Sequence, residues 1–407
     1  MRTFKGFIDF SYSKYASLDF LSNLETIFCD GDMNIIGNSN LEQLNFDSLS
    51  NITCDFSIVD NPRLDLSSFC EKFEGLVILN TRNNLKNCAG CQAYNFYYDE
   101  FEQFRECTLV TFGLSFRSFT IMEMDPVPDL SAFGKIQNVT RGFEVYQTDL
   151  FDLKFLKSLE NIKGTPYTGY FDYDINIQSS RNLTRFGIPN LKQLIPRVPN
   201  FRINVQAVHN DFCFTTSEFK FFLDQKVVFA NLEAKICEND TTACIFKTMK
   251  NLEQNCSEIL GKIKIASGDE VYTEKLKNVK NIWGSLTISN TTLTDLNFLG
   301  NLEYVALLND SSIPVQVISN KMLKKVKIPS LKRVFSKSVY QISFQNSGDG
   351  FLNSTGCLDL IENVFETYVV FDGRQCEVID RIKNYHYVEA WLWGALSLTG
   401  ILYFLVF

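Results

Sequence analysis

The sequence is poor in the residues and motifs that most enzymes need. Its 407 residues include two histidines, His209 and His386, so acid–base catalysis and metal binding lack their commonest side chain. It contains no Gly-x-Ser-x-Gly, His-Glu-x-x-His or phosphate-binding glycine loop. We therefore expect a protein that is not an enzyme, with no catalytic residue, no metal and no cofactor.

Blocks of like charge are scarce as well, and the net charge is −8. A general nucleic-acid binder would carry a basic face, so that class is disfavoured. Lysines do gather in one stretch, at Lys321, Lys324, Lys325, Lys327 and Lys332. We interpret this stretch as the solvated face of a β structure, with an acidic partner as the alternative.

Cysteine, in contrast, is abundant and even in number, with twelve residues. Eight Asn-x-Ser/Thr sequons accompany them, at Asn51, Asn138, Asn182, Asn239, Asn255, Asn290, Asn309 and Asn353. Disulfides are rare in the cytosol, so the two features together predict a glycosylated protein of the secretory pathway. Cys88-Ala-Gly-Cys91 has the spacing of a redox motif. Its counterpart, Cys237 and Cys244, has six residues between the cysteines, which favours a structural role.

The C-terminal segment from Ala390 to Phe407 contains no charged residue. As a helix it would be about 27 Å long, close to the thickness of a hydrocarbon core. Trp391 and Trp393 stand where interfacial aromatics are common. We expect this segment to anchor the protein at the cell surface, either as a spanning helix or as a lipid-anchor signal. The alternative is a buried core helix.

One ten-residue pattern occurs three times in the chain. Leu18–Ile27, Leu153–Ile162 and Leu296–Val305 all read Leu-x-Phe-Leu-x-x-Leu-Glu followed by an apolar residue two places on. Each is preceded by a glycine and an alternating apolar segment, beginning at Gly6, Gly142 and Gly284. The sequence therefore contains three copies of one module.

A second pattern follows each copy, and its apolar residues share one spacing. They are Leu41, Leu44, Phe46, Leu49 and Ile52; Leu183, Phe186, Ile188, Leu191 and Leu194; and Leu323, Val326, Ile328, Leu331 and Val334. Apolar clusters recur about every 25 residues with Asn, Ser and Gly between them. This predicts the rungs of a β-solenoid, in which stacked rungs share one core. Ordinary globular domains with Leu-rich helices are the alternative, but β-branched residues and turn signals favour short strands around Leu-x-x-Leu-Glu.

Each solenoid is expected to end in a short helix. Thr215-Thr-Ser-Glu218 has capping-box spacing, and Phe219, Phe222 and Leu223 fall on one helical face. In the third copy, Leu360, Ile361, Val364 and Phe365 have a similar pattern. Such helices would cover the open ends of the solenoids.

These repeats and the terminal cysteines resemble the receptor L-domain, the ligand-binding module of insulin and EGF receptor ectodomains. They are most similar to nematode-type membrane proteins that carry several L-domains and no kinase. The resemblance implies an all-β-dominated fold of tandem right-handed parallel β-helices, leucine-rich-repeat-like, with short capping helices. The furin-like cysteine-rich region that separates L-domains in the receptors is reduced here to a short linker.

We expect five segments: L-domain 1 at 1–90, L-domain 2 at 91–240, L-domain 3 at 241–378, a juxtamembrane linker at 379–389 and the anchor at 390–407. The third copy has an earlier rung, Ile259–Ile265, for which the first copy has no room. We therefore expect about one further rung and a signal peptide before this sequence.

The order of the cysteines in the copies predicts local disulfides. One bridge would end each module: Cys70–Cys88, Cys213–Cys237 and Cys357–Cys376. A second would open the next module: Cys91–Cys107 and Cys244–Cys256. Cys29 and Cys54 lie 25 residues apart, one rung, so we predict that they bridge neighbouring rungs.

For function, the resemblance implies cell-surface recognition of an extracellular protein or peptide, such as an insulin-like factor. Without a kinase the protein would act as a co-receptor, decoy or presenter. A cell-adhesion or extracellular-matrix component is the second hypothesis, and a β-helix carbohydrate-active enzyme is the third. The sequence indicates no ligand-binding residues.

Overall fold

A computed structural model describes residues 2–375 except 30–31, 74–76, 78, 89, 94–95, 97, 119–128, 165–172, 197–198, 239–242, 348–359 and 361–363. Two compact units are present, one formed by Met1–Phe214 with Lys220–Ala234 and the other by Thr215–Phe219 with Lys235–Phe407. The first unit contains the first and second copies of the repeat, and the second unit contains the third copy. The fold is mainly β, its sheets are mostly parallel, and its helices are short.

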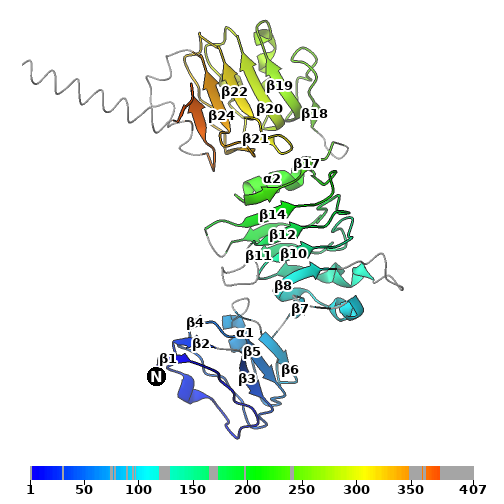
Figure 1. Ribbon diagram of the computed structural model, residues 1–407, viewed down its shortest axis with the longest axis vertical. Helices are drawn as coiled ribbons and strands as arrows, with labels where there is room; N and C mark the ends of the chain where they lie inside the picture. Colours follow the sequence, from blue (N-terminus) through cyan, green and yellow to red (C-terminus); the bar gives the residue numbers. More distant parts are fainter. Residues whose placement is uncertain are drawn as a thin grey trace, which may run out of the picture. The chain divides into compact units, whose positions relative to one another are not determined.

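The first copy forms two three-stranded parallel sheets (Figure 1). One consists of β1 (Thr3–Lys5), β2 (Thr26–Phe28) and β4 (Asn51–Ile52), and the other of β3 (Met33–Ile36), β5 (Phe56–Val59) and β6 (Leu79–Arg82). The segment after Gly6 was expected to be a strand, but it makes one isolated bridge, Asp9 with Asn34. Alternating apolar residues of the strands point into a common core.

The second copy forms one large sheet in the order β13-β11-β9-β8-β10-β12-β14-β16, with β7 paired to β8. Its strands are β7 (Cys91–Ala93), β8 (Leu109–Arg117), β9 (Asn138–Val139), β10 (Phe143–Tyr146), β11 (Asn161–Lys163), β12 (Ile175–Gln178), β13 (Gln193–Ile195), β14 (Arg202–Gln206) and β16 (Val228–Leu232). The first half of β8 pairs with β9 and its second half with β10. Two rows of parallel strands therefore meet in β8. A separate pair joins β15 (Cys213–Phe214) to β17 (Lys235–Ile236).

The third copy repeats this arrangement in the order β18-β19-β20-β22-β24-β25-β26, with β21 joining β20 to β23. Its strands are β18 (Cys244–Ile245), β19 (Glu258–Ile265), β20 (Asn281–Ser289), β21 (Tyr304–Leu307), β22 (Val315–Ile318), β23 (Arg333–Ser336), β24 (Ile342–Gln345), β25 (Val369–Phe371) and β26 (Arg374–Gln375). The expected earlier rung is present as β19. The two rows of strands meet at Gly284, whose φ is +156° and whose added Cβ would lie 2.0 Å from the Gly261 carbonyl oxygen. Only glycine fits this position.

The Leu-x-Phe-Leu segments are turns, and the short strands expected around them follow directly as β2, β11 and β21. Asp19–Leu21 (η1) and Asn297–Leu299 (η6) are 3₁₀-helices. In the first copy Leu21 N–H donates to the Leu18 carbonyl and Leu24 N–H to the Leu21 carbonyl. Leucines three residues apart fall on one face of a helix with 3.0 residues per turn, and this face points into the core. Further 3₁₀-helices are η2 (Tyr98–Phe104), η4 (Leu130–Lys135) and η5 (Glu270–Leu276).

Buried asparagines connect successive rungs of the first copy. The Asn61 side chain is completely buried; its Nδ2 donates to Asn84 Oδ1 (2.9 Å), and its Oδ1 accepts from Asn38 N (2.9 Å) and Asn38 Nδ2 (3.0 Å). The third copy places Asn320 at the equivalent turn, where its Oδ1 accepts from Thr291. These side chains satisfy backbone groups that the turns leave without strand partners.

Two short α-helices are described, α1 (Ser67–Phe73) and α2 (Thr216–Asp224). The predicted capping box of α2 is confirmed, because Thr215 N–H donates to Glu218 Oε2 (2.8 Å) and Glu218 N–H to Thr215 Oγ1 (3.1 Å). Phe219, Phe222 and Leu223 are buried, as expected. In the third copy, Leu360 is helical and buried, and Ile361 lies outside the described residues. Val364 and Phe365 are half-buried but lie outside any helix, so the prediction of a helix there was wrong for these two residues.

The disulfides follow the predicted order. Cys29–Cys54, Cys70–Cys88, Cys91–Cys107 and Cys244–Cys256 are bonded, and Cys213 and Cys237 are also disulfide-bonded. The Cα atoms of Cys29 and Cys54 are 5.2 Å apart, and Ile27 pairs with Ile52 on the adjacent strands. The rung register predicted for the first copy is therefore confirmed. Cys357 and Cys376 lie outside the described residues.

No helix in the part of the chain that the structure describes is long and apolar enough to cross a membrane. The predicted anchor, residues 390–407, lies outside the described residues.

Candidate ligand-binding surface

Parallel strands give each copy a flat row of outward-facing polar side chains. Because side chains alternate along a strand, the residues between buried apolar positions face away from the core. In the first copy the register aligns Asn34, Ser57 and Asn80, and in the third it aligns Thr287, Gln316 and Ser343. In the third copy the row continues to Lys264 of β19, which pairs with Thr287.

The row in the second copy is the longest and holds a buried carboxylate. Glu144 Oε2 accepts from Ser115 Oγ (2.7 Å), and Glu144 Oε1 accepts from Asn176 Nδ2 (3.0 Å). Asn204 Nδ2 donates to Asn176 Oδ1 (2.8 Å), and Asn231 Nδ2 donates to Asn204 Oδ1 (2.9 Å). One chain of hydrogen bonds therefore crosses five adjacent strands.

A second row of outward-facing residues runs beside the first, two residues further along each strand. It aligns Arg117, Tyr146, Gln178 and Gln206. Arg117 donates to Glu144 Oε2 through both Nε (3.1 Å) and Nη2 (2.7 Å), and its guanidinium lies 5.3 Å from the Tyr146 ring centre. Half of the Arg117 side chain stays exposed. We call these two rows the sheet face of the second copy.

The sheet face holds its charged group in a fixed position before any ligand binds. Arg117 is fixed by a buried carboxylate and an aromatic ring, so little side-chain freedom remains to be lost on binding. Arginine and tyrosine are also the residues that contribute most often to protein–protein binding energy. The sequence analysis missed this surface; the signal was a glutamate within the alternating strand Phe143–Tyr146.

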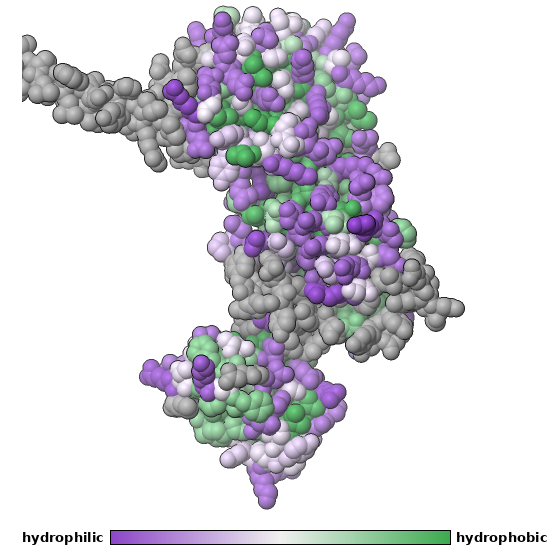
Figure 2. All heavy atoms as spheres, in the orientation of Figure 1, coloured by the Kyte–Doolittle hydropathy of each residue, from purple (hydrophilic) through white to green (hydrophobic). Residues whose placement is uncertain are grey.

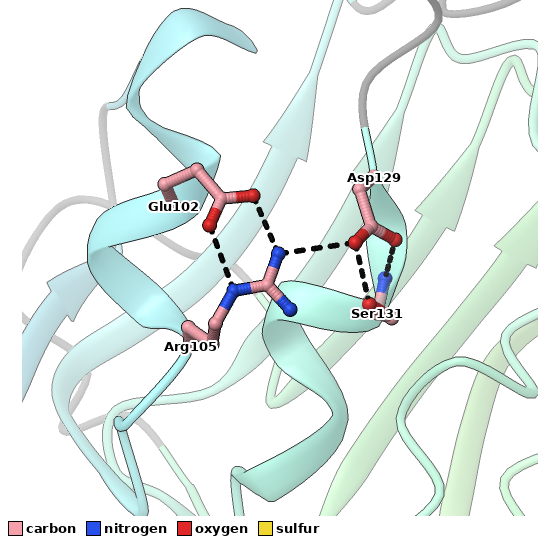
Figure 3. Close-up of polar contacts among 4 residues, drawn as sticks. All are labelled: Glu102, Arg105, Asp129 and Ser131. Carbon is pink, nitrogen blue, oxygen red and sulfur yellow. Dashed lines mark hydrogen bonds and ion pairs between the residues drawn. The ribbon is translucent and has the colours of Figure 1, made fainter.

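A second polar network links η2 to η4 at the start of the second copy (Figure 3). Arg105 donates to both Glu102 oxygens (2.7 and 2.6 Å) and to Asp129 Oδ2 (3.1 Å). Hydrogen bonds from Ser131 and then from Arg105 lower the pKa of Asp129 to about 2. The hydrogen bond from Arg105 lowers the pKa of Glu102, and those with Glu102 and Asp129 raise the pKa of Arg105. Because Asp129 also caps η4, this network is structural.

Arg333 is the clearest buried charge of the third copy. Its side chain is 3% exposed, donates to Glu366 Oε2 (2.7 Å), and lies against the rings of Phe335 and Phe365. Burial lowers its pKa to about 10, and Glu366 partly opposes this shift. Rings and a carboxylate surround this group, so it stabilises the fold.

Neither of two further candidate sites supports chemistry or a small ligand. Cys244, Glu253 and Cys256 lie close enough to suggest a metal site, but the two cysteines are bonded to each other. A cavity of about 240 Å³ beside Trp283 and the Gly261–Gly284 contact is smaller than most drug-sized sites. The Cys88-Ala-Gly-Cys91 motif is divided between two disulfides, so it is not a redox pair.

The predicted glycosylation sites are not among the residues that form the sheet face. Asn51, Asn182, Asn255, Asn290 and Asn309 are exposed, and Asn138 is half-buried and accepts from Asn161 Nδ2 (2.8 Å). Asn239 and Asn353 lie outside the described residues. Glycosylation itself stays a prediction.

Two comparisons place the chain among known proteins. The receptor L domain family matches residues 106–225 and 255–349, within the second and third copies. Protein irld-34 of Caenorhabditis elegans is 27% identical over 164 residues, which cover 36% of this chain and 39% of that protein. The chain thus spans about two fifths of the curated relative it matches. Because the family match extends over more than half of the residues, the chain belongs to the receptor L domain family.

Proposed function

We propose that this chain is a non-catalytic cell-surface recognition protein that binds a secreted peptide factor. By similarity to receptor ectodomains, the factor is an insulin-like peptide, and the chain acts as a co-receptor, decoy or presenter. Each copy would be a right-handed parallel β-helix, in L-domains spanning 1–90, 91–240 and 241–378. The uncharged segment 390–407 would hold the protein at the cell surface.

The sheet face of the second copy is the observation that supports this proposal best. It combines Arg117 and Tyr146 with polar side chains on a rigid sheet. Such a surface suits a folded peptide hormone, which presents both apolar and charged groups. On the face of the C-terminal unit drawn in Figure 2, hydrophilic and hydrophobic residues are interspersed, as on most protein surfaces.

The test is binding of the full-length chain to a panel of secreted insulin-like peptides, measured by surface plasmon resonance. The chain would be produced in a secreting host behind an added signal peptide. Arg117→Ala and Tyr146→Ala should each raise the Kd at least tenfold, the usual effect of removing a central interface residue. Arg181→Ala is the matched control, because Arg181 is exposed on the same copy away from the sheet face; its Kd should stay within about twofold of the unaltered chain.

Two results would contradict the proposal. If no peptide of the panel binds but the chain attaches to intact cells, the protein is an adhesion or matrix component. If a peptide binds with equal affinity to all three variants, binding occurs but the sheet face is not the site.

A further inference from the structure

One face of the third copy is strongly basic in an otherwise acidic protein. Residues 311–348 contain six lysines, one arginine and no acidic residue, whereas the whole chain has a net charge of −8. Lys332 pairs with Glu303 and Arg333 with Glu366. We define the lysine face as Lys321, Lys324, Lys325 and Lys327, which are all exposed and form no ion pair with any described residue.

The fold fixes where these lysines point. Leu323, Val326 and Ile328 alternate with them and are buried in the core of the third copy. Lys324 N–H and Lys325 N–H both donate to the Thr294 carbonyl of the preceding rung (2.8 and 3.3 Å). The backbone therefore belongs to the rung stack, and the four lysine side chains are exposed between its buried apolar residues.

The same position in the other copies shows that the fold does not require lysine there. Lys324 N–H donates to Thr294 O (2.8 Å) as Thr184 N–H does to Phe151 O (3.0 Å) and Glu42 N–H to Ala16 O (2.9 Å). The equivalent outward residue is thus basic in the third copy, neutral in the second and acidic in the first.

Four exposed lysines that pair with no described carboxylate concentrate positive charge on the third copy. Such a charged patch attracts an anionic ligand.

We propose that the lysine face binds a sulfated polysaccharide. Ammonium groups act as point charges for oxyanions such as sulfate. No arginine lies on the lysine face. Disulfide bonds place the domain outside the cytosol, where nucleic acids are not the expected polyanions. The site is separate from the sheet face, because it lies on a different copy and takes a different class of ligand.

The test measures binding of the full-length chain to immobilised heparin over a range of salt concentrations. The variant replaces all four residues of the lysine face with glutamine: Lys321→Gln, Lys324→Gln, Lys325→Gln and Lys327→Gln. The control variant makes the same change at four lysines in exposed ion pairs, Lys86, Lys135, Lys192 and Lys220. Both variants lower the net charge equally, and circular dichroism checks that both fold.

The lysine-face variant should bind heparin at least tenfold more weakly, and the control less than threefold more weakly. The slope of log Kd against log salt should fall by about three, because each contact to the polyanion releases somewhat less than one counterion. Equal weakening of the two variants, or no binding by the unaltered chain, would overturn the proposal. So would equally tight binding to desulfated heparin or to poly-glutamate, since these would identify other ligands.

Discussion

Replacing Asn61 with alanine should destabilise the first copy more than a typical polar substitution. The Asn61 side chain is fully buried and makes five hydrogen bonds, two of them with Asn38 and one with Asn84. Asn61→Ala removes all five and leaves the buried Asn38 N–H without its acceptor. The two N–H groups and the carbonyl oxygen of the side chain contribute about 1 kcal/mol each, and the unsatisfied Asn38 N–H costs about 1–3 kcal/mol, so the loss should be about 4–6 kcal/mol.

Hydrogen exchange of the full-length chain, read by mass spectrometry on peptides from residues 32–66, measures this loss locally. The matched control is Asn80→Ala, because Asn80 is exposed and makes one hydrogen bond, to Ser57 Oγ at 3.3 Å. Its effect should stay within about 0.5 kcal/mol. If the two variants exchange equally fast, the buried asparagines do not hold the rungs together and the reasoning fails.

Three further predictions concern covalent links and pH. Replacing Cys29 and Cys54 together with serine should lower the free energy of unfolding of the first copy by about 3.5 kcal/mol, the loop entropy of a 25-residue closure; no change in denaturant midpoint would contradict this. The lowered pKa of Asp129 means that its contribution to stability is complete above about pH 4 and is lost as pH falls through about 2. In NMR titrations Ser131→Ala should therefore raise the pKa of Asp129 more than Arg105→Gln does, since Ser131 is the larger cause. Glycosidase treatment of the chain from a secretory host should lower its mass; an unchanged mass would rule out use of the sequons.

The repeated pattern predicted the features that depend on register. Aligning the copies gave the parallel strands after Gly142 and Gly284 and the 25-residue offset that brings Cys29 next to Cys54. The capping box of α2 was predictable because its chemistry is local to Thr215 and Glu218. The spacing of residues in the sequence is enough to predict such features, because neighbouring rungs repeat one geometry.

Three features were not predicted from the sequence: the 3₁₀-turns of the leucine repeats, the buried asparagines and the sheet face. The short strands predicted around Leu-x-x-Leu-Glu are present, but the 3₁₀-turn of Leu18, Leu21 and Leu24 was not predicted, although a three-residue period is typical of such a turn. The buried asparagines of the first copy occur 23 residues apart, but the second copy has Thr148 and Ser180 in this role. Asparagine is therefore not repeated at this position in all three copies, and the sequence repeat does not reveal its role. The sheet face was missed because outward residues do not repeat between copies.

Because outward residues differ between the copies, one fold carries different surfaces. Glu42, Thr184 and Lys324 occupy equivalent positions, and the backbone N–H of each donates to a carbonyl of the preceding rung. The outward side chain can therefore change from acidic to basic without altering the backbone. Residues shared by all three copies therefore report on the fold, and residues that differ between equivalent positions report on binding. On this argument Arg117 and Lys324 are positions where function resides, because the residues at the equivalent positions of the other copies are not basic.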